Sequence, residues 1–190
     1  GGRYRDLFEK LLAPRLRPDS RVFELGPGRG SWTRPMLERL PQGELHAVDF
    51  QDVAAWLHPE RYKGRLICHR IEDNSFRELP SDHFDLFWSF GVLCHNNASQ
   101  IELVLRNAFP KLKRGAWCIH QYANWEKLDR YGWAKGAVPP EFRDLPDDAI
   151  WWPRNDAATM ASLIERTGYR LDTADCNLVP RDSIALFRKE

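Results

Sequence analysis

Three glycines at alternate positions, directly after a short hydrophobic run, constrain the fold of this chain more than any other feature. The run is Arg21-Val-Phe-Glu-Leu25, and Gly26-Pro27-Gly28-Arg29-Gly30 follows at once. A helical pattern of apolar residues then occupies residues 31–40. Glycine tolerates positive φ and lets the backbone pass close to a ligand, and a helix start offers unpaired N–H groups. The stretch predicts a strand, a tight turn and a helix, with a nucleotide-like cofactor across the turn; the alternative is that the glycines only end a strand.

The spacing of the glycines separates two classes of cofactor. The dinucleotide fingerprint is G-x-G-x-x-G, whereas this turn is G-x-G-x-G, with Ser31 where the fingerprint has glycine. With Glu24 two residues before the first glycine, the turn resembles the first motif of class I methyltransferases that use S-adenosylmethionine (SAM). That resemblance implies that Glu24, Pro27 and the three glycines Gly26, Gly28 and Gly30 lie at the cofactor, with the glycines under its methionine and ribose part.

A second acid follows the next predicted strand, residues 44–49, which ends in Asp49 and is followed by Phe50. A carboxylate at the tip of the strand beside the glycine turn can accept hydrogen bonds from both ribose hydroxyls. Phe50 is placed to lie against the adenine ring. The alternative for Asp49 is an exposed loop residue.

A third short strand, residues 66–70, leads into Ile71-Glu-Asp-Asn-Ser75. This stretch resembles the place where an acid of the methyltransferases meets the adenine amino group. The resemblance assigns that role to Asp73, with the amide of Asn74 beside it and Glu72 as the competing acid. A side-chain acceptor suits the exocyclic amine of adenine.

The run at residues 84–89 is hydrophobic apart from Asp85, as expected for a strand buried on both faces. It should lie beside the first strand and form the switch point at which open α/β sheets bind ligands. Ser89 and Phe90 would then lie beside the methionine part of the cofactor. The segment resembles the S-F-G-V-x-x-H stretch of bacterial small-molecule and glycan O-methyltransferases. It lacks the [DNS]-P-P-[YF] motif of enzymes that methylate nucleic-acid amines, so no nucleic-acid partner is expected.

Two histidines are candidate catalytic residues. An alcohol that accepts a methyl group must lose its proton, and His95, just past this strand, is placed to take it. The alternative is that His95 only positions the loop, the cofactor or the substrate. His120, after the next strand, is a second candidate base. Neither histidine has a metal-like partner spacing, and the sequence shows no ligand-type His/Asp/Glu cluster, so no metal is expected.

The remaining pattern completes a doubly wound α/β domain over residues 1–190. It predicts a first helix at 4–12, with Tyr4 over the cofactor or simply packed, a helix at 101–112 capped at Gly115, and a strand at 116–122. A helix capped by Asp156 and strands at 169–179 and 183–188 close the chain. The resemblance implies a Rossmann-like class I methyltransferase fold with seven mostly parallel strands in the order 3-2-1-4-5-7-6, the last antiparallel, and helices on both faces.

Residues 123–155 are irregular, rich in proline and aromatic, and are predicted to form a lid or substrate-binding insertion. Their aromatic side chains suit either stacking on a sugar or ring-bearing acceptor, or a small core of the lid itself.

Composition bounds the function. The 28 Lys and Arg against 27 Asp and Glu give a net charge of +1, which offers no reason to expect a polyanionic partner. No apolar run approaches the ~20 residues of a membrane span, and no leader is expected; the start at Gly1-Gly2 predicts a processed, tagged or truncated end. The four cysteines have no disulfide-like or metal-like spacing, which predicts free thiols and a cytoplasmic location.

The function expected from these features is methyl transfer from SAM to a hydroxyl of a small molecule or bacterial glycan. Two alternatives remain: a non-catalytic methyltransferase-like binding module and, against the glycine spacing, an NAD-dependent oxidoreductase.

Overall fold

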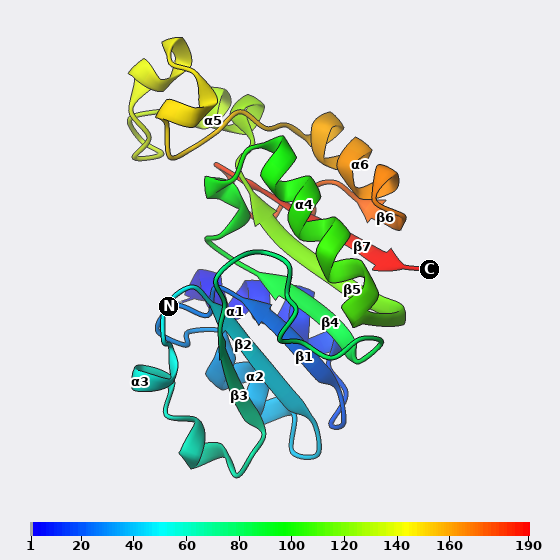
Figure 1. Ribbon diagram of the computed structural model, residues 1–190. Coiled ribbons are helices and arrows are strands. Elements are labelled where there is room, and N and C mark those ends of the chain that lie inside the picture. Colours follow the sequence, from blue (N-terminus) through cyan, green and yellow to red (C-terminus); the bar gives the residue numbers. More distant parts are fainter. Residues whose placement is uncertain (1) are drawn as a thin grey trace.

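Seven strands form one sheet in the computed structural model of the protein, which describes residues 2–190 (Figure 1). Gly1, part of the predicted processed or truncated start, lies outside the described residues. The strand order is β3-β2-β1-β4-β5-β7-β6, as predicted. The strands are β1 (Arg21–Leu25), β2 (Glu44–Asp49), β3 (Leu66–Arg70), β4 (Phe84–Ser89), β5 (Leu112–Tyr122), β6 (Tyr169–Thr173) and β7 (Ser183–Lys189). Strands β1 to β5 pair in parallel, and β7 runs antiparallel to both β5 and β6.

Helices cover both faces of this sheet (Figure 1). One face carries α4 (Ala98–Ala108) and α6 (Ala157–Arg166), and the other carries α1 (Gly2–Leu7) and α2 (Thr33–Arg39). The shorter segments are η1 (Phe8–Leu12), η2 (Ala13–Arg15), α3 (Ala54–Leu57), η3 (Pro59–Tyr62), η4 (Leu93–His95), η5 (Phe109–Lys111), α5 (Trp125–Tyr131), η6 (Pro140–Asp144) and η7 (Asp147–Ala149). Because the strands of the sheet centre alternate their side chains between two apolar cores, both faces of the sheet are covered.

Side-chain caps fix where the two long helices begin. Asn97 accepts the backbone N–H of Gln100 at 3.0 Å, and Gln100 accepts the N–H of Asn97 at 2.9 Å, which is a complete capping box for α4. Asp156 accepts the N–H of Thr159 at 2.7 Å, so the predicted N-cap of α6 is confirmed.

The predicted helix at 101–112 is too long, and its predicted cap at Gly115 is wrong. Helix α4 ends at Ala108, and β5 begins at Leu112. Pro110 explains the early end, because proline removes a helix hydrogen bond and clashes with the preceding turn. Gly115 lies inside β5 with φ of 81°, where the pairing with β4 shifts register.

Two other boundaries also differ from the predictions. Helix α2 begins at Thr33, since residues up to Trp32 still belong to the glycine turn. Strand β6 ends at Thr173 instead of residue 179. Asp175 accounts for that end, because its carboxylate accepts the backbone N–H of Asn177 at 2.9 Å and closes a turn.

Residues 123–155 lie beyond the end of β5, where the C-terminal ends of the central strands point (Figure 1). Most of their large aromatic side chains pack together: Trp133, Phe142 and Trp152 are buried in a separate apolar cluster. Two aromatics lie outside this cluster: Trp151, with 46% of its surface exposed, and the partly buried Tyr131. The aromatics were predicted either to stack on an acceptor or to form a small core of the segment. Most of them form such a core.

Candidate cofactor and active site

The glycine turn after β1 is built around three left-handed residues, but only one faces open space. Gly26, Gly28 and Gly30 have φ of 68°, 53° and 82°. A Cβ at Gly26 would lie 2.3 Å from Val92, and one at Gly30 would lie 2.7 Å from Leu57, so both are required by packing. A Cβ at Gly28 would meet no atom within 4 Å. Gly28 therefore leaves a bare stretch of backbone where a ligand can lie.

A cavity of about 380 Å³ opens beside this turn and is named here the Asp49 cavity. Gly26, Gly28, Asp49, Phe50 and Asn74 line it, so the residues predicted for ribose and adenine meet in one place. Asp49 Oδ1 accepts the backbone N–H of Gln51 at 2.9 Å, which holds the carboxylate at the tip of β2. Phe50 is 51% exposed at the rim, an arrangement that suits an aromatic ligand ring.

Two further cavities continue the Asp49 cavity along the C-terminal ends of the strands. The central cavity, of about 410 Å³, shares Gly26, Gly28 and His95 with it and is also lined by Pro27. The Tyr131 cavity, of about 280 Å³, shares Tyr4 and Phe90 with the central one. The three form one groove, with room for an extended cofactor and, at the far end, a second molecule.

Tyr4 lines the groove from α1, where it was predicted either to lie over the cofactor or simply to pack. Its ring packs edge-to-face on Trp32 at 5.2 Å and on Phe90 at 5.7 Å between centroids. Phe90 lines both the central and the Tyr131 cavities, so its predicted place beside the methionine part of a cofactor agrees with the geometry. These aromatics give the junction of the two cavities an apolar wall.

His95 stands where the Asp49 and central cavities meet, with an exposed side chain. Its Nδ1 lies 2.8 Å from the carbonyl oxygen of Trp151, and its ring packs on Trp152 at 5.3 Å. Since a carbonyl only accepts hydrogen bonds, Nδ1 carries the hydrogen, and the Nε2 of the neutral ring keeps a free lone pair. His95 thus has the position and the tautomer needed to accept a proton.

Glu24 does not line the groove, contrary to the prediction. It is fully buried, and its Oε2 accepts the hydroxyl hydrogen of Thr33 at 2.6 Å. Burial raises the pKa of this carboxyl to about 8, although the hydrogen bond from Thr33 acts against the shift. Glu24 therefore stabilises the glycine turn indirectly, through its hydrogen bond with Thr33 at the start of α2.

Ser89 and His120 also lie away from the groove. Both are fully buried, and Ser89 Oγ is 2.8 Å from His120 Nδ1. The imidazole packs against Phe87 at 4.3 Å on the face covered by α4 and α6. Burial lowers the pKa of His120 to about 3. Strand alternation thus turns this histidine into the core, where it cannot touch an acceptor, and the candidate catalytic role of His120 is not retained.

Asp73 is displaced from its predicted role by its own neighbours. Its carboxylate is half-exposed outside the groove, accepts the backbone N–H of Ser75 at 2.8 Å and pairs with Arg77. The hydrogen bonds from Ser75, followed by Arg77, lower the pKa of Asp73. The neighbouring Asn74 lines the Asp49 cavity instead.

A polar chain at the far end of the groove was missed by the sequence analysis. Gln121 is 3% exposed, accepts the backbone N–H of Gly91 at 2.7 Å and donates to Asp182 at 2.5 Å. Arg181 in turn binds Asp182 at 2.8 Å and the carbonyl of Gly136 at 2.7 Å. These hydrogen bonds link the loop after β4, strand β5, the segment 123–155 and the turn before β7. The members of this polar chain are too far apart in sequence for any local pattern to reveal it.

The prediction that no ligand-type cluster exists is wrong for the opposite edge of the sheet. Glu44, His46 and His83 bring one ligand atom each to within 4.8 Å of one another. Elsewhere, Cys68, Cys94, Cys118 and Cys176 are free thiols, as predicted. Among residues 2–190, no helix is both long and apolar enough to cross a bilayer.

Comparison with known proteins identifies the class. A family model described as "Methyltransferase domain" matches residues 23–118, and the chain belongs to this family. With its strand order and groove, it is a class I SAM-dependent methyltransferase domain, as the glycine turn predicted.

The chain is similar in sequence to a ribosomal RNA methyltransferase and to a small part of a large synthetase. Over 86 residues, 45% of this chain, it is 38% identical to ribosomal RNA small subunit methyltransferase A of Laribacter hongkongensis (strain HLHK9), covering 28% of that protein. Over 162 residues, 80% of this chain, it is 26% identical to the hybrid PKS-NRPS synthetase mpsA of Macrophomina phaseolina (strain MS6), covering 4% of it. The chain thus spans under a third of either relative.

A solved structure of a SAM-dependent methyltransferase from Mesorhizobium loti has the same fold. The TM-score is 0.70 at 18% identity, over 100% of this chain and 98% of that one.

Proposed function

We propose that this chain transfers a methyl group from SAM to a hydroxyl of a small molecule or glycan, with His95 taking the proton of that hydroxyl. The observation that carries the proposal is the continuous groove that joins Gly28, Asp49 and His95. The residues fit the cofactor: Gly28 offers bare backbone, Asp49 a carboxylate for the ribose, and Phe50 and Asn74 an aromatic and an amide for adenine. When bound, SAM supplies a methyl group on a sulfonium.

His95 acts as the base in this proposal. The carbonyl of Trp151 orients the ring and fixes the hydrogen on Nδ1, so Nε2 can take the acceptor's proton as the oxygen attacks. A charged alkoxide then need not form in advance. In the alternative, His95 only positions the cofactor or substrate. The contact with Trp151 would then still orient the ring, but His95 would transfer no proton.

The segment 123–155 acts as a lid over the acceptor end within a domain of residues 1–190. Trp152 lines the central cavity, and Tyr131 and Lys135 line the Tyr131 cavity. Because methyl transfer is an in-line displacement, alignment of the two reactants and removal of water contribute much of the rate. The lid contributes to both when an acceptor fills the Tyr131 cavity.

The sequence after β4 favours a hydroxyl acceptor over a nucleic-acid amine. Ser89-Phe90-Gly91-Val92 stands where amine methyltransferases of nucleic acids carry [DNS]-P-P-[YF]. The similarity to the ribosomal RNA enzyme covers under half of this chain, and the net charge of +1 offers no general attraction for RNA. The free cysteines support a cytoplasmic location.

The test uses labelled SAM with matched panels of hydroxylated small molecules, glycans, amines and RNA, and locates the methyl group by mass spectrometry. We expect label on oxygen. Label on nitrogen or on RNA contradicts the acceptor class. No transfer to any panel, by a protein that still binds the cofactor, favours a non-catalytic binding module.

A further inference from the structure

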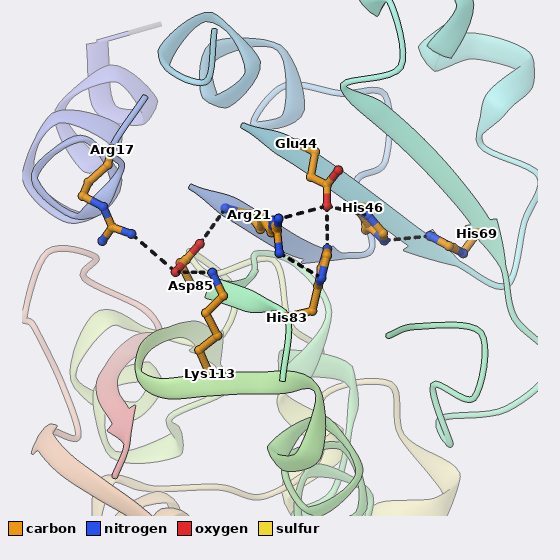
Figure 2. A network of polar contacts seen from close by, with 8 residues as sticks. All are labelled: Arg17, Arg21, Glu44, His46, His69, His83, Asp85 and Lys113. Carbon is orange, nitrogen blue, oxygen red and sulfur yellow. Dashed lines mark hydrogen bonds and ion pairs between the residues drawn. The ribbon is translucent and has the colours of Figure 1, made fainter. Parts of the chain in front are cut away.

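Figure 2 shows a cluster of one carboxylate and three imidazoles at the N-terminal end of the sheet. None of its residues lines the cavities of the groove. Glu44 is the first residue of β2, and His46 lies two residues further on, so both project from the same face of the strand. His83 immediately precedes β4 and reaches across the start of β1 (Figure 2). His69 comes from β3 on the other side.

Three ligand atoms converge in this cluster. Glu44 Oε1 lies 2.5 Å from His83 Nε2 and 3.5 Å from His46 Nε2, and all three atoms lie within 4.8 Å of one another. Zinc takes imidazole nitrogens and carboxylate oxygens at about 2.0–2.2 Å, and its tetrahedral ligands are then about 3.3 Å apart. The observed spacings bracket that value. Glu44 and His83 are partly exposed, so a fourth ligand could come from water.

His69 orients one of the ligands. Its Nε2 lies 3.0 Å from Nδ1 of His46, and the two rings stack at 4.9 Å. With the hydrogen on His46 Nδ1 donated to His69, the lone pair of His46 Nε2 points toward Glu44. Histidine ligands of metals are typically held in this way by a hydrogen bond from their second nitrogen.

From this geometry we propose that Glu44, His46 and His83 form a binding site for a divalent transition metal, with zinc as the metal expected, and that His69 is its positioning residue. The two-histidine, one-carboxylate set matches known zinc sites. The metal would link His83, just before β4, to Glu44 and His46 of β2, across the start of β1. It lies at the opposite edge from the methyl-transfer groove and takes no part in that reaction.

Arg21 opposes metal binding. Its Nη1 lies 3.3 Å from His83 Nδ1. Since a guanidinium only donates, this contact places the hydrogen of the neutral His83 ring on Nε2, where it bonds Glu44. Metal on Nε2 moves that hydrogen to Nδ1, with no net proton released, and Arg21 must turn away. Its side chain is 46% exposed, which leaves room for this movement.

The test is calorimetric titration of the chelator-treated protein with zinc chloride alone. We expect one equivalent to bind the wild type, and His83→Asn and His46→Asn to lose that binding. His58→Asn is the matched control, because His58 is an exposed histidine paired with a single acid, Glu60, at 3.3 Å. Binding of S-adenosylhomocysteine (SAH) at the opposite edge and the circular dichroism spectrum report folding of each variant.

Two further variants sharpen the result. Arg21→Gln should tighten zinc binding at least threefold, and His69→Asn should weaken it about 10–100-fold without changing the stoichiometry. At a hundredfold excess of zinc over Kd, the Tm of the wild type should rise by about 5–10 °C, and that of His83→Asn should not. No zinc binding by the wild type, or equal binding by His83→Asn and His58→Asn, overturns the proposal.

Discussion

Replacing Gly28 by alanine separates cofactor binding from fold stability. Gly28 has φ of 53°, and the added Cβ would meet no protein atom within 4 Å. The left-handed conformation costs a non-glycine residue about 1–2 kcal/mol. Loss of freedom in the unfolded chain offsets about 0.4–1 kcal/mol of this. The net destabilisation is therefore about 1 kcal/mol, or a fall in Tm of about 2–4 °C for a chain of this size.

Gly64 provides the matched control. It has φ of 82°, a Cβ there would likewise meet nothing within 4 Å, and it lies between η3 and β3, away from the groove. Gly64→Ala should lose the same stability as Gly28→Ala. Only the Gly28 substitution places a methyl group in the cavities, so only there should the affinity for SAH fall, by at least about tenfold, or about 1.4 kcal/mol.

The assay pairs calorimetric titration with SAH and thermal unfolding of both variants. Equal Tm values with a loss of affinity confined to Gly28→Ala support a cofactor lying across the turn. Equal affinities for the two variants refute it, because the added methyl group would then fill space that the cofactor never uses. Gly26→Ala is less informative, since its Cβ would strike Val92 and lower stability as well.

Three further substitutions test separate parts of the account. Asp49→Asn keeps an acceptor for the N–H of Gln51 but removes the charge offered to the ribose. We expect SAH to bind about tenfold more weakly and the free energy of unfolding to fall by under about 1 kcal/mol. An unchanged calorimetric affinity for SAH would contradict the ribose role. His95→Gln should lower the rate of labelled methyl transfer about 10²–10⁴-fold with little change in the Kd of SAH, whereas near-normal turnover removes His95 as the base. Glu24→Gln should flatten the pH dependence of stability. Burial raises the pKa of Glu24 from 4.5 to about 8, so its contribution is complete below pH 4.5 and is lost as the pH rises through 8, by up to about 1.4 kcal/mol per pH unit. The urea unfolding midpoints of wild type and variant between pH 6 and 8 measure this loss of stability. If both midpoints change equally with pH, the raised pKa of Glu24 is contradicted.

Elements set by local pattern were predictable from the sequence. Strands β2, β3 and β4 have the predicted bounds, because each is a short segment with turn-forming residues in the loops beside it. The same reasoning placed Gly28, Asp49 and His95 at the ends of neighbouring strands, and the groove joins them. The strand order followed from resemblance to a family, which carries information that the residues alone do not.

Features that depend on which side a residue faces were not predictable in this way. His120 was expected after its strand, but β5 continues to Tyr122, and the histidine points from inside the strand into the core under α4 and α6. Asn74 lines the Asp49 cavity as predicted, whereas Asp73 lies outside it because its carboxylate pairs with Arg77. Glu44 and His83 are distant in sequence, and only the sheet order brings them together across β1.

The most direct test of the central claim is calorimetric titration of the purified protein with SAH, with NAD as the parallel ligand. The groove around Gly28 and Asp49 predicts micromolar binding of SAH and none of NAD. Binding of NAD alone, or of neither ligand, would contradict the account.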